Sequence, residues 1–222
     1  MKTIVIAIDG PAGAGKTTVS KLVAKELGFI HVDTGAMYRA VTYKLLNSNI
    51  PLDDIEKVNS ELDKMEIETK ICNNEVVIYI EEKDVSSEMR SEYVSVNVNT
   101  VAAIPQIREK LRKIQRSIGE KYNCVMEGRV ITTVVFPDTK FKFYLDAPIE
   151  ERALRRYKEL LQKGEKISFE DVKKAIIQRD QLDKTRGINP LKIDKDAIVI
   201  NTYGLTQQEV AQKIISYVKS ML

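Results

Sequence analysis

Residues 10–17 carry the clearest chemistry in this chain, because they read G-P-A-G-A-G-K-T. The spacing matches G-x-x-x-x-G-K-[ST], the pattern of a loop whose backbone N–H groups cradle nucleotide phosphates. In that pattern Lys16 reaches the β- and γ-phosphates, and the hydroxyl of Thr17 holds Mg²⁺. An apolar, β-branched run at 3–9 precedes the loop and a helical repeat at 17–28 follows it, which is the order that anion binding at a helix N-terminus requires. The alternative, a glycine-rich turn with a stray lysine, does not account for these flanking elements. The predicted nucleotide-binding residues are Gly10, Pro11, Ala12, Gly13, Ala14, Gly15, Lys16, Thr17 and Thr18.

Arginines in loops and after predicted strands indicate what the second substrate is. A hydroxyl that accepts a phosphoryl group needs a carboxylate base, whereas a phosphate acceptor is already ionised and needs cations that offset the repulsion between two anions. The planar fork of arginine suits bidentate contact with phosphate. Any one of these arginines could be an ordinary surface residue, but five at such positions favour an anionic acceptor. They are Arg39, Arg108, Arg129, Arg179 and Arg186.

The composition is that of a globular protein of one domain, with 222 residues, 43% hydrophobic and 30% charged. The net charge of +3 is small and no helix pattern combines a basic stripe with aromatic residues, so no nucleic-acid partner is expected. No stretch approaches 18 apolar residues, so no membrane span is expected, and the expected compartment is the cytoplasm. Cys72 and Cys124 are too few for a disulfide framework, and the single His31 excludes a histidine-ligated metal centre. With no exposed apolar heptad, a monomer is expected.

Strand-like runs alternate with helical patterns along the chain. This alternation predicts the α/β class, with a parallel sheet covered by helices on both faces. The predicted strands are 3–9, 122–126, 141–146 and 197–200, and one helix is predicted to begin near Pro105. Three candidate capping boxes predict further helix starts: Asp53 with Glu56, Ser168 with Asp171, and Thr206 with Glu209.

Two segments depart from this alternation within a single domain that spans 1–222. The runs 66–71 and 76–81 alternate like strands, so a β-hairpin is predicted inside an insertion at about 60–86. The helical run at about 150–166 is rich in arginine. It could form a lid over phosphates or be an ordinary solvated helix face.

Over essentially its whole length the chain resembles the bacterial cytidylate kinases, a family of the nucleoside-monophosphate kinase group. The phosphate loop is shared by many kinases, whereas D-T-G-A-M-Y-R at 33–39 and T-V-V-F-P-D at 133–138 are far more particular to this family. The other matching blocks are I-D-G-P-A-G-A-G-K-T at 8–17, V-A-A-I-P-Q-I-R at 101–108, L-D-A at 145–147, E-E-R-A-L-R-R at 150–156 and R-D-x-x-D-x-x-R at 179–186. The resemblance implies a P-loop NTPase-type α/β fold with a small hairpin insertion and a helical lid.

The resemblance also implies the reaction and the residues that serve it. ATP and CMP or dCMP would give ADP and the diphosphate, with Mg²⁺ held at Thr17 and small nucleotides as the only partners. The implied catalytic residues are Lys16, Arg129, Arg152, Arg155 and Arg156, of which the last three would close over the transferring group as lid residues. The implied acceptor-binding residues are Arg39, Arg129 and Arg186 for the phosphate, Arg179 and Asp183 for the ribose, and Thr34, Asn99 and Arg108 near the cytosine.

The chain departs from the family pattern after its central strand. The family block reads G-R-D-x-G-T, whereas residues 128–133 read G-R-V-I-T-T, so the aspartate implicated in contacting the base is Val130. A valine cannot accept a hydrogen bond from the cytosine amino group, and losing such a contact costs about 1–3 kcal/mol, or roughly ten- to a hundredfold in discrimination against uracil. Asn99 stands where the family has a serine. Either selectivity is reduced, or another group or water takes over the contact.

Two other functions remain open from the sequence. A small-molecule kinase of the shikimate or gluconate type would share the phosphate loop, but would need neither the hairpin nor Asp183 between two arginines. A nucleotide-dependent switch without transfer activity would fit the altered block at Val130, but not Lys16 combined with lid arginines.

Overall fold

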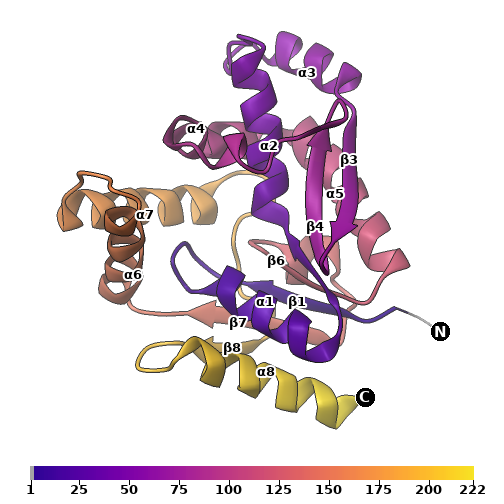
Figure 1. The fold of residues 1–222 in the computed structure, drawn as a ribbon, viewed down its shortest axis with the longest axis vertical. Coiled ribbons are helices and arrows are strands. Elements are labelled where there is room, and N and C mark those ends of the chain that lie inside the picture. The colour runs from indigo at the N-terminus through magenta and orange to yellow at the C-terminus, as the bar shows by residue number, and fades with distance from the viewer. Residues whose placement is uncertain (1–2) are drawn as a thin grey trace.

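The computed structural model describes residues 3–222 and contains one mixed, mostly parallel sheet. Its strands lie in the order β3-β4-β2-β6-β1-β7-β8, with β5 paired to β4 (Figure 1). The strands are β1 (Val5–Asp9), β2 (Ile30–Asp33), β3 (Ile67–Cys72), β4 (Glu75–Ile80), β5 (Lys83–Asp84), β6 (Cys124–Gly128), β7 (Phe141–Asp146) and β8 (Ile198–Asn201). The pairs β4–β2, β2–β6, β6–β1, β1–β7 and β7–β8 are parallel. Only the β3–β4 and β4–β5 pairs are antiparallel. The predicted α/β class is therefore confirmed.

Helices cover both faces of this sheet, because successive side chains of a buried strand point to opposite sides. On β1, Ile6 and Ile8 pack with α1 and α8 in one core, whereas Val5 and Ala7 pack with α2 and α5 in another. The α-helices are α1 (Lys16–Leu27), α2 (Thr34–Asn47), α3 (Ile55–Lys64), α4 (Glu92–Ala103), α5 (Pro105–Lys121), α6 (Ile149–Gln162), α7 (Phe169–Thr185) and α8 (Gln207–Met221). A 3-10 turn (Glu88–Arg90) precedes α4, and a five-residue π-helix (Ile131–Val135) follows β6.

The helix starts agree with two of the three predicted capping boxes. Thr206 and Glu209 form the reciprocal box of α8, and the Ser168 hydroxyl caps α7 by accepting the Asp171 N–H. The third was placed one residue too early, because Asp54 and not Asp53 is the cap of α3. A turn that joins the Asp54 N–H to the Pro51 carbonyl sets this start, and the Asp54 carboxylate then accepts the Lys57 N–H.

The predicted hairpin is present as β3 and β4, each displaced by one residue from its predicted run. Its turn places Asn73 and Asn74 at positive φ, a conformation that asparagine tolerates better than most residues. The hairpin does not stand apart from the sheet, because the His31 N–H of β2 donates to the Asn74 carbonyl at 2.8 Å. Strand β2 was not among the predicted strands. The limits of 60–86 for the insertion remain a prediction.

Helices α6 and α7 form a small third core with the phosphate loop. Ala153 and Leu160 of α6 pack with Val172 and Ile176 of α7, and Ala12 belongs to the same cluster. In Figure 1 the two helices lie beside the carboxyl ends of the strands. The helix predicted for 150–166 is α6, and its action as a lid remains a prediction. Across residues 3–222, no helix is both long and apolar enough to cross a membrane.

Candidate nucleotide-binding and phosphoryl-transfer site

Three parallel strands bring polar side chains to one edge of the sheet. Strand β1 ends at Asp9, β2 at Asp33 and β6 at Gly128, and the register pairs Asp9 with Gly128 and Asp33 with Glu127. The carboxyl ends of parallel strands are where open α/β sheets bind their ligands. The phosphate loop and Arg129 leave the sheet at this edge.

The phosphate loop is fixed by close backbone packing. A Cβ on Gly10 would lie 2.2 Å from the Leu145 carbonyl oxygen, and one on Gly13 would lie 2.9 Å from that of Arg152. Only glycine therefore fits where the loop crosses β7 and the first turn of α6. The N-cap residue Gly15 supplies no side chain to the first N–H groups of α1, so these groups remain available to an anion in the loop.

Lys16 is buried at the base of this loop, where its ammonium group donates to the Pro11 carbonyl at 2.8 Å. Burial and the nearby positive charge of Arg129 lower the pKa of Lys16 to about 7. An anion bound beside Lys16 would stabilise its buried ammonium group, because an opposite charge favours the protonated form. The geometry thus suits a triphosphate over Lys16.

Thr17 contacts a buried carboxylate that the sequence analysis did not single out. Its hydroxyl donates to Glu127 Oε2 at 3.1 Å, while Glu127 Oε1 lies 3.1 Å from His31 Nε2. Glu127 and His31 are both buried. The available signal was a charged residue that directly follows the apolar run 122–126, at a strand end.

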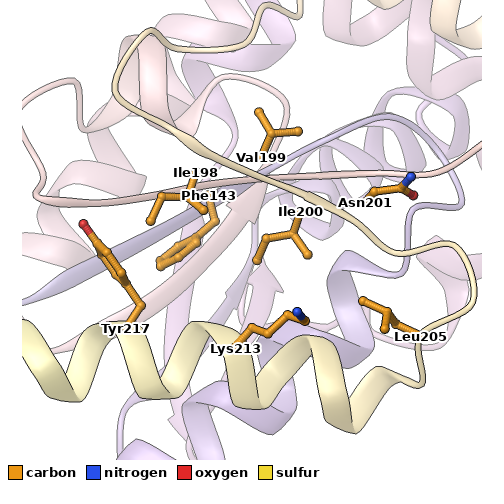
Figure 2. Close-up of a pocket in the computed structure, with 8 residues that line it drawn as sticks. All are labelled: Phe143, Ile198, Val199, Ile200, Asn201, Leu205, Lys213 and Tyr217. Atoms are coloured by element: carbon orange, nitrogen blue, oxygen red, sulfur yellow. The ribbon is translucent and has the colours of Figure 1, made fainter.

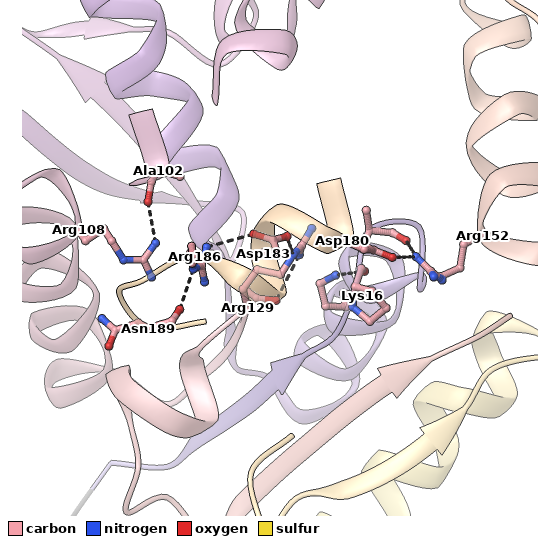
Figure 3. Close-up of polar contacts among 12 residues, drawn as sticks. Lys16, Ala102, Arg108, Arg129, Arg152, Asp180, Asp183, Arg186 and Asn189 are labelled. Carbon is pink, nitrogen blue, oxygen red and sulfur yellow. Dashed lines mark hydrogen bonds and ion pairs between the residues drawn. The ribbon is translucent and has the colours of Figure 1, made fainter. Parts of the chain in front are cut away.

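The second half of the site is a cluster of guanidinium groups around Asp183 (Figure 3). Arg129 Nε donates to Asp183 Oδ2 at 2.9 Å, and Arg186 Nη1 donates to Asp183 Oδ1 at 3.1 Å. Although burial alone would raise the pKa of Asp183, Arg129 and its neighbours hold it below the ordinary value. Arg186 also donates to the Asn189 carbonyl, and Arg108 donates to that of Ala102.

This cluster contains more donors than the protein satisfies. Among the described residues, the buried nitrogens without a hydrogen-bond partner include Arg108 Nε, Arg179 Nε and Arg186 Nη2. Burial and the neighbouring Arg129 lower the pKa of Arg179 to about 10. Arg39 is paired with Asp33 at 2.8 Å. Buried donors left unsatisfied are costly, so three of them in neighbouring arginines point to an anionic ligand.

Thr34 lies at the start of α2, against the end of β6, and Asn99 lies on α4. The Thr34 hydroxyl is buried and donates to the Glu127 carbonyl at 2.6 Å, so it holds the end of β6. Asn99 is half-buried. Val130 is buried at the start of the π-helix and adds no polar side-chain atom there.

Asp9, which directly precedes the phosphate loop, is hydrogen-bonded to the turn that follows Arg129. Its carboxylate accepts the Ile131 N–H at 2.9 Å, the Thr132 N–H at 2.8 Å and the Thr132 hydroxyl at 2.6 Å. Burial raises the pKa of Asp9 against the effect of these donors. Sequence analysis missed this role, because the partners lie 122 and 123 positions away.

Arg152 was predicted as a lid residue, but its side chain is buried against the phosphate loop. Its Nε donates to the Ala147 carbonyl at 2.9 Å, and its Nη1 donates to the Ala12 carbonyl at 3.0 Å and to Asp180. Asp180 in turn accepts the Ala12 N–H at 3.2 Å. Figure 3 shows this group next to Lys16.

The two other predicted lid arginines are paired with other groups of the protein. Arg155 donates twice to Thr202, through Nη1 to the hydroxyl and through Nη2 to the carbonyl, both at 3.0 Å. Arg156 makes a partly exposed pair with Glu159 at 3.1 Å. The catalytic roles expected of the three arginines remain predictions.

Two cavities lie near β8. One of about 360 Å³ opens beside the phosphate loop, between Gly15, Arg155 and the segment around Thr202 and Thr206. The other, of about 330 Å³, lies between β8 and α8 and includes no residue of the phosphate loop or of the arginine cluster (Figure 2). Only the first adjoins the predicted nucleotide site.

Comparison with known proteins identifies the family. The family model described as Cytidylate kinase matches residues 6–220. The chain belongs to the cytidylate kinase family. It is 46% identical over 215 residues to the cytidylate kinase of Caldicellulosiruptor saccharolyticus, which covers 97% of this chain and 95% of that protein. It is 48% identical over 217 residues to that of Caldanaerobacter subterraneus subsp. tengcongensis, with 98% and 95% covered, and 45% identical over 219 residues to that of Halalkalibacterium halodurans, with 99% of each covered.

The family places this chain among the nucleoside-monophosphate kinases, as the resemblance predicted, and does not favour a shikimate-type kinase or a switch. Among solved structures, an uncharacterized protein from Eubacterium ventriosum superimposes with a TM-score of 0.52 at 13% identity, over 98% of this chain and 99% of that one. At that identity the likeness shows the fold alone.

Proposed function

We propose that this kinase transfers the γ-phosphoryl group of ATP to CMP or dCMP, giving ADP and the corresponding diphosphate. One observation carries the proposal: in a member of the cytidylate kinase family, buried arginine donors without protein partners belong to the cluster around Asp183, and Arg129 and Arg179 of that cluster lie close enough to Lys16 to lower its pKa. An acceptor hydroxyl would need a base, whereas an ionised phosphate needs the cations that this cluster supplies.

ATP would bind with its phosphates in the loop 10–18. The N-terminal N–H groups of α1 and the Lys16 ammonium group would contact the β- and γ-phosphates. The cavity of about 360 Å³ beside Gly15 adjoins this loop and would receive the adenosine. Arg155 and Thr202 form part of its lining, so Arg155 would contact the nucleoside as well as the polyphosphate.

Mg²⁺ would bind where Thr17 faces Glu127. A hydroxyl and a carboxylate 3.1 Å apart supply the hard oxygen ligands that Mg²⁺ prefers, and phosphate oxygens would complete its shell. When bound, the ion neutralises charge on the transferring phosphoryl group. Glu127 is kept in place by His31 and by the Thr34 bond to its backbone.

CMP would bind with its phosphate among Arg39, Arg129 and Arg186. Arg179 and Asp183 would contact the ribose, since each Asp183 oxygen keeps a lone pair after pairing with one arginine. Thr34, Asn99 and Arg108 would lie near the cytosine.

Transfer then needs alignment and charge compensation more than proton transfer. Arg129 lies close enough to Lys16 to lower its pKa, so the two cations would stabilise the donor and acceptor sides of one transition state. Movement of the segment 150–166 as a lid would exclude water and limit hydrolysis of ATP. The protein would act as a cytoplasmic monomer on small nucleotides.

The test is ADP release from Mg-ATP with CMP, dCMP, UMP, AMP, shikimate or no acceptor. We expect turnover with CMP and dCMP, and none with shikimate. A CMP rate more than tenfold above that for UMP would show that Val130 is tolerated, and equal rates would show that selectivity is reduced. No acceptor-dependent ADP would overturn the proposal, with the Lys16→Met variant as the background control.

A further inference from the structure

Helix α7 faces both halves of the site with neighbouring residues. Arg179 and Asp183 are four positions apart and therefore lie on one face of the helix, which is directed at the arginine cluster. Asp180, one residue along from Arg179, is directed instead at the phosphate loop. One helix thus carries contacts to the donor site and to the acceptor site.

The contact with the loop is specific to one residue, Ala12. Asp180 accepts its N–H at 3.2 Å, and Arg152, paired with Asp180, donates to its carbonyl at 3.0 Å. A buried ion pair thereby satisfies both backbone polar groups of Ala12. All three residues are more than 90% buried.

Packing reinforces the same contact. Ala12 belongs to the apolar cluster formed by α6 and α7, and Gly13 lies against the backbone of Arg152. Close-packed interiors transmit displacement, so a shift of residues 12 and 13 must be followed by α6 and α7.

We propose that Asp180 is a positioning residue that couples the two substrate sites, so that a triphosphate in the loop sets the acceptor-facing side of α7. This inference rests on the proposed function. When phosphates bind in the loop, the Ala12 contact holds α7 through Asp180. Arg179 and Asp183 are then presented to the acceptor in their binding geometry. By linkage, an acceptor on α7 favours triphosphate binding to the same degree.

The experiment measures CMP affinity by calorimetry with and without a non-transferable ATP analogue and Mg²⁺. In the unaltered protein we expect CMP to bind roughly tenfold more tightly with the analogue, which is within the range of known coupling between sites. In Asp180→Asn we expect this ratio to fall to about twofold or less, because the charge that pairs with Arg152 is gone. The matched control is Lys173→Gln, which breaks the 3.1 Å pair of Lys173 with Glu150 between the same two helices and lies outside both the loop and the segment 150–166. It should keep the full ratio.

Other outcomes would overturn the inference. These are a ratio near one in the unaltered protein, an unchanged ratio in Asp180→Asn, or a proportional loss of both affinities at constant ratio, which would make Asp180 only a support of the loop. If Asp180→Asn does not fold, the double variant Arg152→Met/Asp180→Asn, which leaves no unpaired buried charge, takes its place.

A measurement on the unaltered protein is independent of any variant. The ATP analogue alone should slow amide hydrogen exchange in residues 179–183, and unchanged exchange there would contradict the coupling. Turnover with CMP tests the proposed function separately. A kinase that is active on CMP but binds its substrates independently would overturn only this inference.

Discussion

Asp180 and Asp183 of α7 both pair with arginine, yet their surroundings differ in one respect. The Asp180 group is closed: the described contacts of Arg152 and Asp180 use the carbonyl and N–H of Ala12 and the carbonyl of Ala147. The Asp183 group is open, because Arg186 Nη2 and the nearby Arg179 Nε have no partner. A satisfied network stabilises a fold, whereas unsatisfied buried donors favour a ligand, so this difference separates a scaffold group from the proposed binding site.

Breaking the closed group should have the largest effect, and on stability. Arg152→Ala leaves Asp180 as an uncompensated buried charge, which costs about 3–5 kcal/mol of unfolding free energy. Arg156→Ala, at a partly exposed pair, should cost about 1 kcal/mol or less. Urea denaturation of both variants checks this, and equal losses would erase the distinction between the two arginines.

Breaking the open group should affect turnover instead. Arg129→Gln removes a donor from the transferring charge, and we expect kcat/KM for CMP to fall by roughly 10²–10³-fold with little loss of stability. Steady-state kinetics measure it, with the exposed Arg90→Gln as control. A loss of stability without loss of turnover would place Arg129 in the scaffold.

The next largest effect is on the choice between CMP and UMP, and it tests whether residue 130, next to Arg129 of the open group, contacts the base. Val130→Asp restores an acceptor for the cytosine amino group, so the CMP-to-UMP ratio of kcat/KM should rise about tenfold or more. Val130→Leu, which adds no acceptor, should leave the ratio unchanged. If Val130→Asp also leaves it unchanged, another group already reads the base.

The smallest effect is a pH dependence of ATP binding. The pKa of Lys16 is lowered to about 7, so in the free protein Lys16 loses its proton as pH rises through 7. A triphosphate favours the protonated form, so ATP binding should take up a proton above pH 7 and weaken by about fivefold from pH 7 to pH 8. Calorimetry in buffers of different ionisation enthalpy detects the uptake. An affinity that does not change over this range would contradict it.

Local patterns predicted the elements whose signals are local. Strand β7 begins and ends at its predicted residues, and α5 begins at Pro105 as its N-terminal proline indicated. Strand β2 was missed because His31 interrupts its short apolar run, and its sheet neighbours come from distant segments.

The site was predictable where a motif or a residue type revealed it. The phosphate loop is continuous in sequence, and the five arginines share one chemistry, so both could be named from the sequence, and their roles remain predictions. The roles of Asp180 and Asp9 were not predicted, because each carboxylate accepts a hydrogen bond from a backbone group more than 100 positions away. The sequence also grouped Arg152 with Arg155 and Arg156, whereas the turn of α6 buries the first and leaves the last partly exposed.

The Asp9 contact also bears on how this site can change through evolution. The turn after Arg129 is fixed largely by backbone N–H groups, since Asp9 holds those of Ile131 and Thr132 and the Val130 carbonyl accepts two more. Backbone groups are the same whatever side chain they carry. Residue 130 can therefore be exchanged, as between aspartate and valine, while the arginine beside it keeps its place. If residue 130 reads the base as proposed, preference for the base can drift without disturbing phosphate transfer.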